Sequence, residues 1–293
     1  MSFDWYKSRW PAKLLLFGEY TVLDGCVGLG IQIPEFYLKT TFVHNMVFDY
    51  SDDICKLWRV VSLGREFKPK KSLAIDSSIP IGYGLGSSAA LCLSVLSLTE
   101  KEFFPHGLTF GERFDLLRKM EAVYHTSSSG VDLLICAATG PVLINMEDRN
   151  TPKIYSANIN KQVEIALLDI GPRKEFNSSF IPKVLHRFKN DTQNNQKWER
   201  YKVLTNSGIE AFLSGDRNIL SGVLTELRKI QYEVGTLTPE MEKGLEMSSG
   251  VLGWKAIGAG GGGVVLVFGE VGFQLPSAIK KASVLWRGVG GGI

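Results

Sequence analysis

The residues best suited to chemistry lie between positions 80 and 132. The segment PIGYGLGSSAALCLSVL, residues 80–96, places three alternating glycines and two serines directly before an apolar run. Backbone N–H groups of such a loop can approach an anion closely, and the N-terminus of the following helix carries partial positive charge toward the same point. The pattern therefore indicates a phosphate site. The alternative is a plain strand-to-helix turn with Ser87 or Ser88 as the N-cap residue.

A carboxylate interrupts the apolar face of the next predicted helix. Phe110, Phe114, Leu117 and Tyr124 follow a helical spacing, and Glu121 occupies the position between the last two. A carboxylate facing a core is costly unless a partner compensates its charge. Glu121 therefore indicates a wet edge, a basic partner, a metal ion or a catalytic lysine.

A second carboxylate, Asp132, follows the polar turn HTSSSGV and begins a short apolar helix that stops at Gly140. At this position an aspartate is most often a helix N-cap, so the residue pattern alone favours a capping role.

Hydrophobic periodicity predicts an α+β chain with strands backed by helices. The predicted strands cover 12–18, 38–50, 71–80, 140–147, 163–171, 254–269 and 282–289. The predicted helices cover 87–102, a segment from the capping-box pair Thr109 and Glu112 to 124, then 132–140, 195–214, 217–234 and 238–248. Because the helix at 87–102 is apolar on all sides, we expect it to be buried.

The bulk composition is that of an ordinary globular chain of two domains. Hydrophobic residues make up 44% and charged residues 22% of 293 positions, and the net charge is +3 without a basic block. This balance disfavours a nucleic-acid or membrane-surface partner and is compatible with a small anionic ligand. The charged stretch 147–162 is the best candidate for a junction, so we predict domains over 1–158 and 159–293.

No signal-peptide pattern is seen, and no apolar run reaches the roughly 18 residues of a membrane span. We therefore expect a cytoplasmic protein. The four cysteines are far apart and contain no CxxC pair, which predicts free thiols. The four histidines are scattered and indicate no histidine-based metal site.

Three segments in order resemble the motifs of the GHMP small-molecule kinases, a superfamily that includes galactokinase, homoserine kinase, mevalonate kinase and phosphomevalonate kinase. They are PAKLLLFGEYTVLDG at 11–25, PIGYGLGSSAA at 80–90 and KAIGAGGGG at 255–263. Within the superfamily, EAVYHTSSSGVD at 121–132 is most similar to mevalonate kinases. The resemblance implies a GHMP-kinase-like fold with an N-terminal nucleotide-binding α+β domain and a C-terminal ferredoxin-like α+β domain.

The resemblance also implies roles for individual residues. Lys13 would pair with Asp132 beside the attacking hydroxyl, and Ser88 and Glu121 would bind Mg²⁺. The implied contacts to the ATP phosphates are Gly82, Gly84, Leu85, Gly86, Ser87, Ser88 and Ala89. The implied substrate pocket is Glu19, Tyr20, Gly258, Ala259, Gly260 and Gly261. The loop is not a P-loop, because it lacks the GxxxxGK[ST] lysine.

The implied function is ATP-dependent phosphorylation of a hydroxyl on a small metabolite, with mevalonate, an isoprenoid precursor, as the favoured acceptor. Tyr20 departs from the histidine usual in mevalonate kinases and is more similar to phosphomevalonate kinases. A second phosphate would need a basic pocket, which Arg173 and Lys174 could supply. Phosphomevalonate, a sugar or an amino-acid alcohol therefore stays an alternative acceptor, and we expect a monomer or homodimer.

The sequence also disfavours two other classes of function. A dinucleotide-binding oxidoreductase is disfavoured because GYGLG lacks the third glycine of the fingerprint at its required position. A nucleotide-binding sensor without catalysis is disfavoured because it has no chemical need for Lys13, Ser88, Glu121 and Asp132 together.

Overall fold

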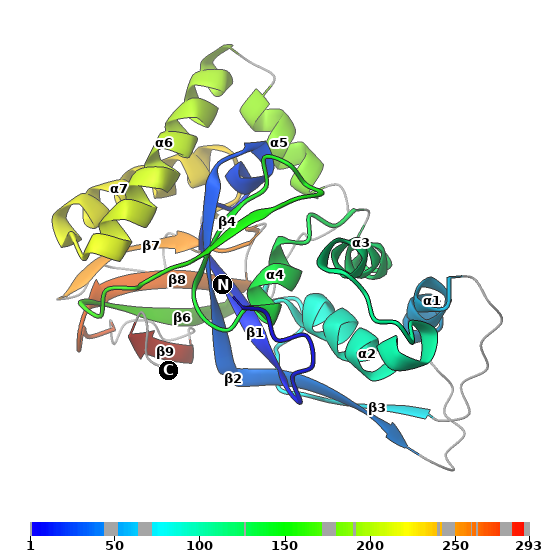
Figure 1. Cartoon of the computed structure of the whole chain (residues 1–293). Coiled ribbons are helices and arrows are strands. Elements are labelled where there is room, and N and C mark those ends of the chain that lie inside the picture. Colours follow the sequence, from blue (N-terminus) through cyan, green and yellow to red (C-terminus); the bar gives the residue numbers. More distant parts are fainter. Residues whose placement is uncertain are drawn as a thin grey trace.

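The chain forms two antiparallel sheets, each built from a different half of the sequence (Figure 1). The computed structural model describes residues 2–43, 52–63, 72–125, 127–171, 180–189, 192–238, 241, 250–258, 260–261, 263–275 and 283–289. The first sheet consists of β1 (Trp10–Phe17), β2 (Val27–Val43), β3 (Ser72–Ser77), β4 (Val142–Asn145) and β5 (Lys153–Ser156). The second consists of β6 (Val163–Gly171), β7 (Val251–Ala256), β8 (Gly263–Glu270) and β9 (Ser283–Val289).

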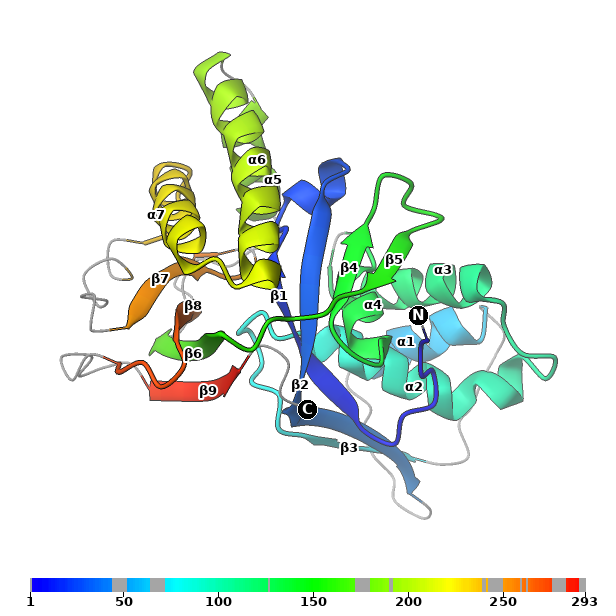
Figure 2. The same ribbon diagram turned by 60° about the vertical axis from the view of Figure 1, so that its left-hand side comes forward.

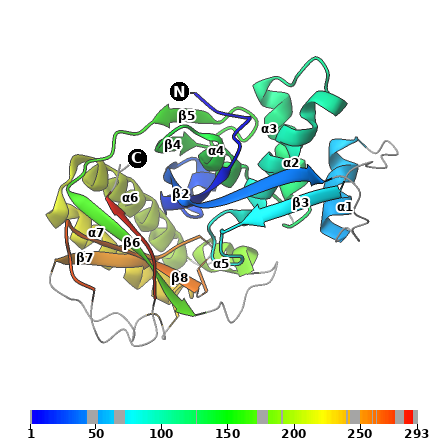
Figure 3. The same ribbon diagram turned by 90° about the horizontal axis from the view of Figure 1, so that it is seen from below.

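The long strand β2 organises the first sheet because it pairs with β1, β3 and β4. The register with β1 shifts between Pro11 and Ala12, and this irregularity lies opposite Pro34. Proline has no N–H to give to a ladder, so a bulge is where a strand tolerates it. Figure 3 shows β2 and β3 reaching away from the second sheet toward α1.

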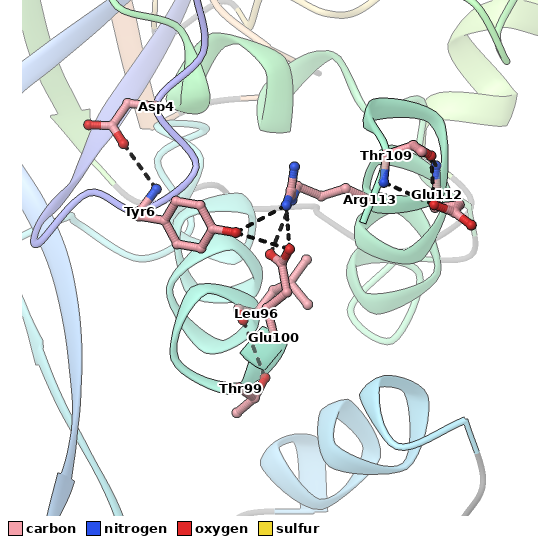
Figure 4. Close-up of polar contacts among 8 residues, drawn as sticks. All are labelled: Asp4, Tyr6, Leu96, Thr99, Glu100, Thr109, Glu112 and Arg113. Atoms are coloured by element: carbon pink, nitrogen blue, oxygen red, sulfur yellow. Dashed lines mark hydrogen bonds and ion pairs between the residues drawn. The ribbon is translucent and has the colours of Figure 1, made fainter. Parts of the chain in front are cut away.

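Helices α1 to α4 gather beside the first sheet (Figure 1). They are α1 (Asp52–Val61), α2 (Ser87–Phe103), α3 (Phe110–Glu121) and α4 (Val131–Ala137), and a short 3₁₀ helix, η1, covers Thr21–Asp24. Helix α2 is buried on most of its surface, which confirms the prediction from its apolar composition. At the start of α3 the Thr109 hydroxyl accepts the Glu112 N–H, and the Glu112 carboxylate accepts the Thr109 N–H at 2.9 Å, so the predicted capping box is present (Figure 4).

The N-terminal segment 2–9 is tied to these helices by polar contacts. The Tyr6 hydroxyl donates to Glu100 of α2 at 3.1 Å, and Glu100 forms a buried ion pair with Arg113 of α3 (Figure 4). The ammonium of Lys7 donates to the carbonyl oxygens of Cys136 and Ala138, at 2.9 and 2.6 Å. The segment therefore joins α2 to α3 and covers the C-terminal end of α4.

In the second sheet the strands lie in the order β7-β8-β6-β9. Counted within this sheet, the order read from β9 is 4-1-3-2, which is the strand order of a ferredoxin-like unit. Helices α6 (Thr192–Ser214) and α7 (Arg217–Glu233) run beside each other over one face of the sheet (Figure 2), and α5 (Phe180–Lys189) packs against α6. This α+β arrangement agrees with the fold class predicted from the sequence.

One hydrophobic core extends through both sheets. Phe17 of β1 packs against Phe212 of α6 and Phe268 of β8, with ring centroids 6.3 and 5.5 Å apart. Gly208 of α6 allows this contact, because a Cβ atom there would lie 2.6 Å from the Phe17 ring. The two halves of the chain are therefore packed together and not merely linked.

Most predicted elements are present, with several corrections among the described residues. Strand β2 already begins at Val27, before the predicted strand 38–50, and the predicted strand 254–269 is divided into β7 and β8. The predicted junction 147–162 contains β5, which pairs with β4 in regular antiparallel register. Helix α1 and helix α5 were not predicted. The predicted strand 38–50 and helix 238–248 lie partly outside the described residues. The boundary at 158/159 falls between β5 and β6, and the division into domains stays a prediction.

All four cysteines are free thiols, as predicted, and Cys92 and Cys136 are buried. Over the described parts of the chain, none of the helices is both long and apolar enough to cross a bilayer.

The Glu100–Arg113 pair generates a prediction about stability. Replacing Glu100 with glutamine leaves the Arg113 guanidinium buried beside a neutral group, so we expect the free energy of unfolding to fall by roughly 3–5 kcal/mol. The exposed ion pair Lys119–Asp115, 2.7 Å long, serves as the matched control, and Asp115→Asn should cost less than about 1 kcal/mol. Urea denaturation measures both losses, and equal losses would contradict the argument from burial.

Candidate active site

Lys13 joins three elements of the site. Its side chain is buried within β1, and its ammonium lies 2.8 Å from a carboxylate oxygen of Asp132 in α4. Its backbone N–H points away from β2 and donates to the carbonyl oxygen of Leu85 at 3.0 Å. The predicted contact between Lys13 and Asp132 is therefore present, and the same lysine holds the glycine loop at the free edge of β1.

Gly86 provides the space for the Lys13 side chain. Its φ angle is +80°, and a Cβ atom at this position would lie 2.6 Å from Cγ of Lys13. Gly82 and Gly84 also have positive φ angles, 83° and 75°, which glycine adopts without the strain that a side chain would cause. Three alternating glycines with positive φ angles thus form the loop that leads into the N-terminus of α2.

The N-cap residue of α2 is Gly86, and neither Ser87 nor Ser88 caps the helix through its side chain. The alternative of a serine N-cap is therefore wrong, because both serines already lie inside the first helical turn. The half-buried Ser87 and Ser88 and the buried Ala89 therefore contribute their backbone N–H groups to the end of the helix that faces the loop.

Helix α4 presents Asp132 from its first turn. Its N-cap is Gly130 (φ +82°), so the interpretation of Asp132 as the N-cap is also wrong. Gly30 of β2 lets α4 approach the sheet, since a Cβ there would lie 2.5 Å from the Ile135 side chain. At the other end of α4, the side chains of Lys7 and Gln32 donate to its last carbonyl groups. Packing and caps at both ends thus fix the position of Asp132.

Glu121 is buried at the C-terminal end of α3, where its carboxylate accepts a hydrogen bond from the Ser128 hydroxyl. Burial raises the pKa of Glu121 to about 7, and the neighbouring Asp132 carboxylate adds to the shift. Ser128 and the Lys13 ammonium oppose it. The charges of Glu121, Asp132 and Lys13 therefore act on one another, and these three groups carry an excess of negative charge when both carboxylates are ionised.

The hydroxyl of Ser88 lies 3.2 Å from Nε2 of His125, four residues after Glu121. Neither His125 nor Ser128 was predicted as a site residue. The segment HTSSSG between α3 and α4 carries both of them, so its polar composition was the available signal. Ser88 and Glu121 supply hydroxyl and carboxylate oxygens, the donor types that Mg²⁺ prefers, and their net negative charge suits a divalent cation.

The second glycine-rich segment follows β7 and also adopts left-handed geometry. Gly258, Gly260 and Gly261 have φ angles of 57°, 75° and 80°. The Gly261 N–H donates to the Thr236 carbonyl oxygen at 2.8 Å, and a Cβ atom on Gly260 would lie 2.4 Å from that same oxygen. Ala259, and the candidate basic residues Arg173 and Lys174, lie outside the described residues.

The two glycine segments lie at the same end of the molecule. The Tyr83 hydroxyl in the first loop donates to Oδ2 of Asp169 in β6 at 3.0 Å. Asp169 pairs with Val264 of β8, and β8 begins at Gly263, directly after the second segment. A contact and a strand register thus connect the loop at 82–86 to the segment at 258–261.

A buried ion pair lies beneath this end. Lys255 of β7 contacts the carboxylate of Glu19, and the two side chains are 1% and 3% exposed. Burial raises the pKa of Glu19 although the Lys255 charge opposes the shift. Tyr20 is buried with its ring 6.5 Å from that of Phe188 in α5, and its φ of 67° is unusual for a residue with a side chain. The assignment of Glu19 and Tyr20 to a substrate pocket stays a prediction, and Lys255 is a partner that sequence reasoning missed.

Comparison with known proteins shows that the chain is similar to GHMP kinases. The model of the GHMP kinases N terminal domain matches residues 55–140. A mevalonate kinase of Pyrococcus furiosus is 25% identical over 307 aligned positions, which cover 86% of each chain.

Solved structures show the same fold. The L. major mevalonate kinase in complex with R-mevalonate superposes with a TM-score of 0.73 at 18% identity, covering 97% of this chain and 96% of that one. A Streptococcus pneumoniae phosphomevalonate kinase, in complex with phosphomevalonate and AMPPNP, gives a TM-score of 0.70 at 20% identity and covers 96% and 98%.

The contact between Gly86 and Lys13 can be tested against a matched glycine. Gly82→Ala places a side chain at φ +83° with no atom within 4 Å, so we expect only the cost of left-handed geometry, about 1–2 kcal/mol. Gly86→Ala has the same backbone cost and must also displace the Lys13 side chain. Denaturant unfolding should therefore show the larger loss for Gly86→Ala, and equal losses would mean that Lys13 moves aside freely.

Proposed function

We propose that this chain is a GHMP kinase that transfers the γ-phosphoryl group of ATP to a hydroxyl group of mevalonate. The observation that carries the proposal is the ion pair between the buried Lys13 and the partly exposed Asp132, which lies beside a glycine loop at the N-terminus of α2. Phosphoryl transfer depends mainly on positioning and on neutralisation of charge, and these groups supply both. The similarity to mevalonate kinases supports the choice of acceptor.

The loop and the first turn of α2 form the proposed phosphate site. Left-handed glycines at 82, 84 and 86 leave the backbone open to close approach, and the start of a 17-residue helix carries partial positive charge. The methylene groups of Lys13 pass over Gly86, and its ammonium group adds a positive charge that is paired with Asp132. We assign the ATP phosphates to Gly82 and residues 84–89, and the contact between nucleotide and acceptor to the region between the predicted domains.

Ser88 and Glu121 are the proposed ligands of a Mg²⁺ ion. These two residues fit a Mg²⁺ ion, because burial raises the pKa of the Glu121 carboxylate to about 7 and a cation would stabilise its ionised form. When bound, the ion neutralises charge on the phosphate oxygens.

Asp132 is the proposed partner of the acceptor hydroxyl. Its side chain is 36% exposed, whereas that of its partner Lys13 is 5% exposed, so the carboxylate is the accessible member of the pair. As the hydroxyl oxygen bonds to the γ-phosphorus, its proton passes to Asp132 and the bond from phosphorus to the ADP oxygen breaks. Lys13 holds the carboxylate in place and stabilises charge on the transferred group.

The acceptor is the part of the proposal that most needs a direct test. Glu19, Tyr20 and the segment 258–261 are the proposed substrate pocket, and Tyr20 keeps phosphomevalonate as the second candidate. Purified protein should be assayed for ADP release from ATP with mevalonate, phosphomevalonate, galactose and homoserine. A kcat/KM at least tenfold higher for phosphomevalonate, about 1.4 kcal/mol of transition-state discrimination, would replace the first candidate with the second. ATP binding without turnover of any acceptor would favour a sensor.

The role of Asp132 predicts a selective loss of turnover. Asp132→Asn keeps the shape of the side chain but removes the proton acceptor, so kcat should fall by roughly 10²- to 10⁴-fold. Affinity for ATP should stay close to that of the unchanged protein. The variant also leaves Lys13 without its anionic partner, so the assay is run well below the thermal unfolding temperature measured for each protein. Near-normal kcat would overturn the mechanism.

Glu121→Gln removes one negative charge, as Asp132→Asn does, but the proposed role of Glu121 predicts a different defect. Glu121→Gln should raise the Mg²⁺ concentration needed for half-maximal rate, and excess Mg²⁺ should restore part of the activity. Asp132→Asn should not respond to Mg²⁺ in this way. Rates are measured against Mg²⁺ concentration for both variants, and an unchanged Mg²⁺ dependence in Glu121→Gln would remove it from the ion site.

A further inference from the structure

The glycine loop needs anchors, because alternating glycines give it little conformational preference of its own. Its second half is fixed by the buried Leu85, whose carbonyl oxygen accepts the Lys13 N–H. In its first half, Tyr83 lies between Gly82 and Gly84 and is the only residue there with a side chain. Whatever anchors this half through a side chain must therefore act through Tyr83.

The anchor of Tyr83 lies in the other sheet. Its hydroxyl donates to Oδ2 of Asp169 at 3.0 Å, across 86 residues of sequence. A hydrogen bond to an ionised acceptor is roughly twice as strong as one between neutral groups. The same bond holds the pKa of Tyr83 above its ordinary value, because it stabilises the protonated phenol.

Asp169 is itself held in place by the sheet. It lies near the end of β6 and pairs with Val264 of β8 on one side and with Ser283 of β9 on the other. A carboxylate on a strand paired at both edges is a more rigid anchor than one on a loop. Its neighbour β8 begins just after the second glycine segment, so Asp169 contacts the first glycine loop and is paired with the strand that follows the second segment.

We propose that Tyr83 and Asp169 act as a positioning pair that holds the first half of the glycine loop against the second sheet in the conformation that binds the nucleotide phosphates. The proposal rests on the function proposed above and adds two residues that touch neither the reacting atoms nor the ion. The pair acts on nucleotide binding through the loop, so its loss should change nucleotide affinity more than the affinity for the acceptor.

The first test needs no ligand. Amide hydrogen exchange of the peptide covering 80–86 is followed in the full-length protein and in Tyr83→Phe, which removes only the hydroxyl. We expect exchange in this peptide to be at least about threefold faster in the variant, with other peptides unchanged. Tyr155→Phe is the matched control, because Tyr155 lies 58% exposed on β5 and should leave the loop unaffected. Unchanged exchange in Tyr83→Phe would overturn the proposal.

Two variants of the partner sharpen the result. Asp169→Asn keeps a carbonyl oxygen that can accept from the tyrosine hydroxyl, so loop exchange should stay close to that of the unchanged protein. Asp169→Ala removes the acceptor and should match Tyr83→Phe. The double variant Tyr83→Phe/Asp169→Ala should show no further increase, since one interaction cannot be lost twice. Additive effects would show that the two residues do not act as a pair.

The second test links the loop to the nucleotide. Calorimetry with AMPPNP and Mg²⁺ should give a Kd about three- to tenfold higher for Tyr83→Phe, since part of the free energy of one hydrogen bond to a charged group is lost to binding. Faster loop exchange with an unchanged Kd would overturn the role in nucleotide binding. If the unchanged protein fails to bind AMPPNP while Tyr83→Phe still loosens the loop, the proposed function fails and the pair survives as a structural anchor.

Discussion

The site depends on a single buried charge, the ammonium group of Lys13. An ammonium without a partner inside a protein is costly, so its position dictates that of an anion. Asp132 supplies the anion, and α4 approaches the sheet closely enough to deliver it because Gly30 has no side chain. The lysine stem also requires the space over Gly86. One charge on an edge strand thereby sets the placement of a helix and the geometry of a loop.

A second buried ammonium group, that of Lys255, is also paired with a carboxylate, and this pair lies at the junction of the two sheets. Glu19 comes directly after β1 and Gly18, and Lys255 lies in β7, so their contact joins the first motif to the strand that leads into the third. Around it, Gln231 of α7 bonds to both the N–H and the carbonyl of Ala256. The polar network and the aromatic core around Phe17 hold the two sheets together, although each sheet takes its strands from one half of the chain.

Local patterns in the sequence were sufficient to predict the parts of the site that depend on neighbouring residues. Glycine spacing located the loop, and helical periodicity identified Glu121 as a carboxylate on a buried face. The pairing of Lys13 with Asp132 came from resemblance to a family, because no local rule connects residues 119 positions apart. The pairing of Glu19 with Lys255 was equally impossible to predict from local patterns, although Lys255 is the first residue of the third recognised motif.

There are physical reasons why some elements and contacts were not predicted. In α1, the buried positions Ile54, Leu57, Trp58 and Val61 follow a helical spacing, so its signal was present but short. Strand β5 is only four residues long and largely exposed, and it owes its conformation to pairing with β4. The contact between Ser88 and His125 depends on the path of the turn between α3 and α4, and composition does not specify such a path.

The Glu19–Lys255 pair has a consequence for how the chain acquires its structure during synthesis. The two residues are 236 positions apart, so the carboxylate leaves the ribosome long before its partner exists. Until Lys255 is made, enclosing Glu19 would bury a charge without compensation, so the end of β1 and the residues around η1 must stay hydrated or be shielded. The first sheet can pair its strands early, but the surface that receives the second sheet closes only when the last strands arrive. Completion of this protein is therefore set by its C-terminal strands, and the nascent N-terminal half exposes an apolar surface that chaperones can bind until those strands are made.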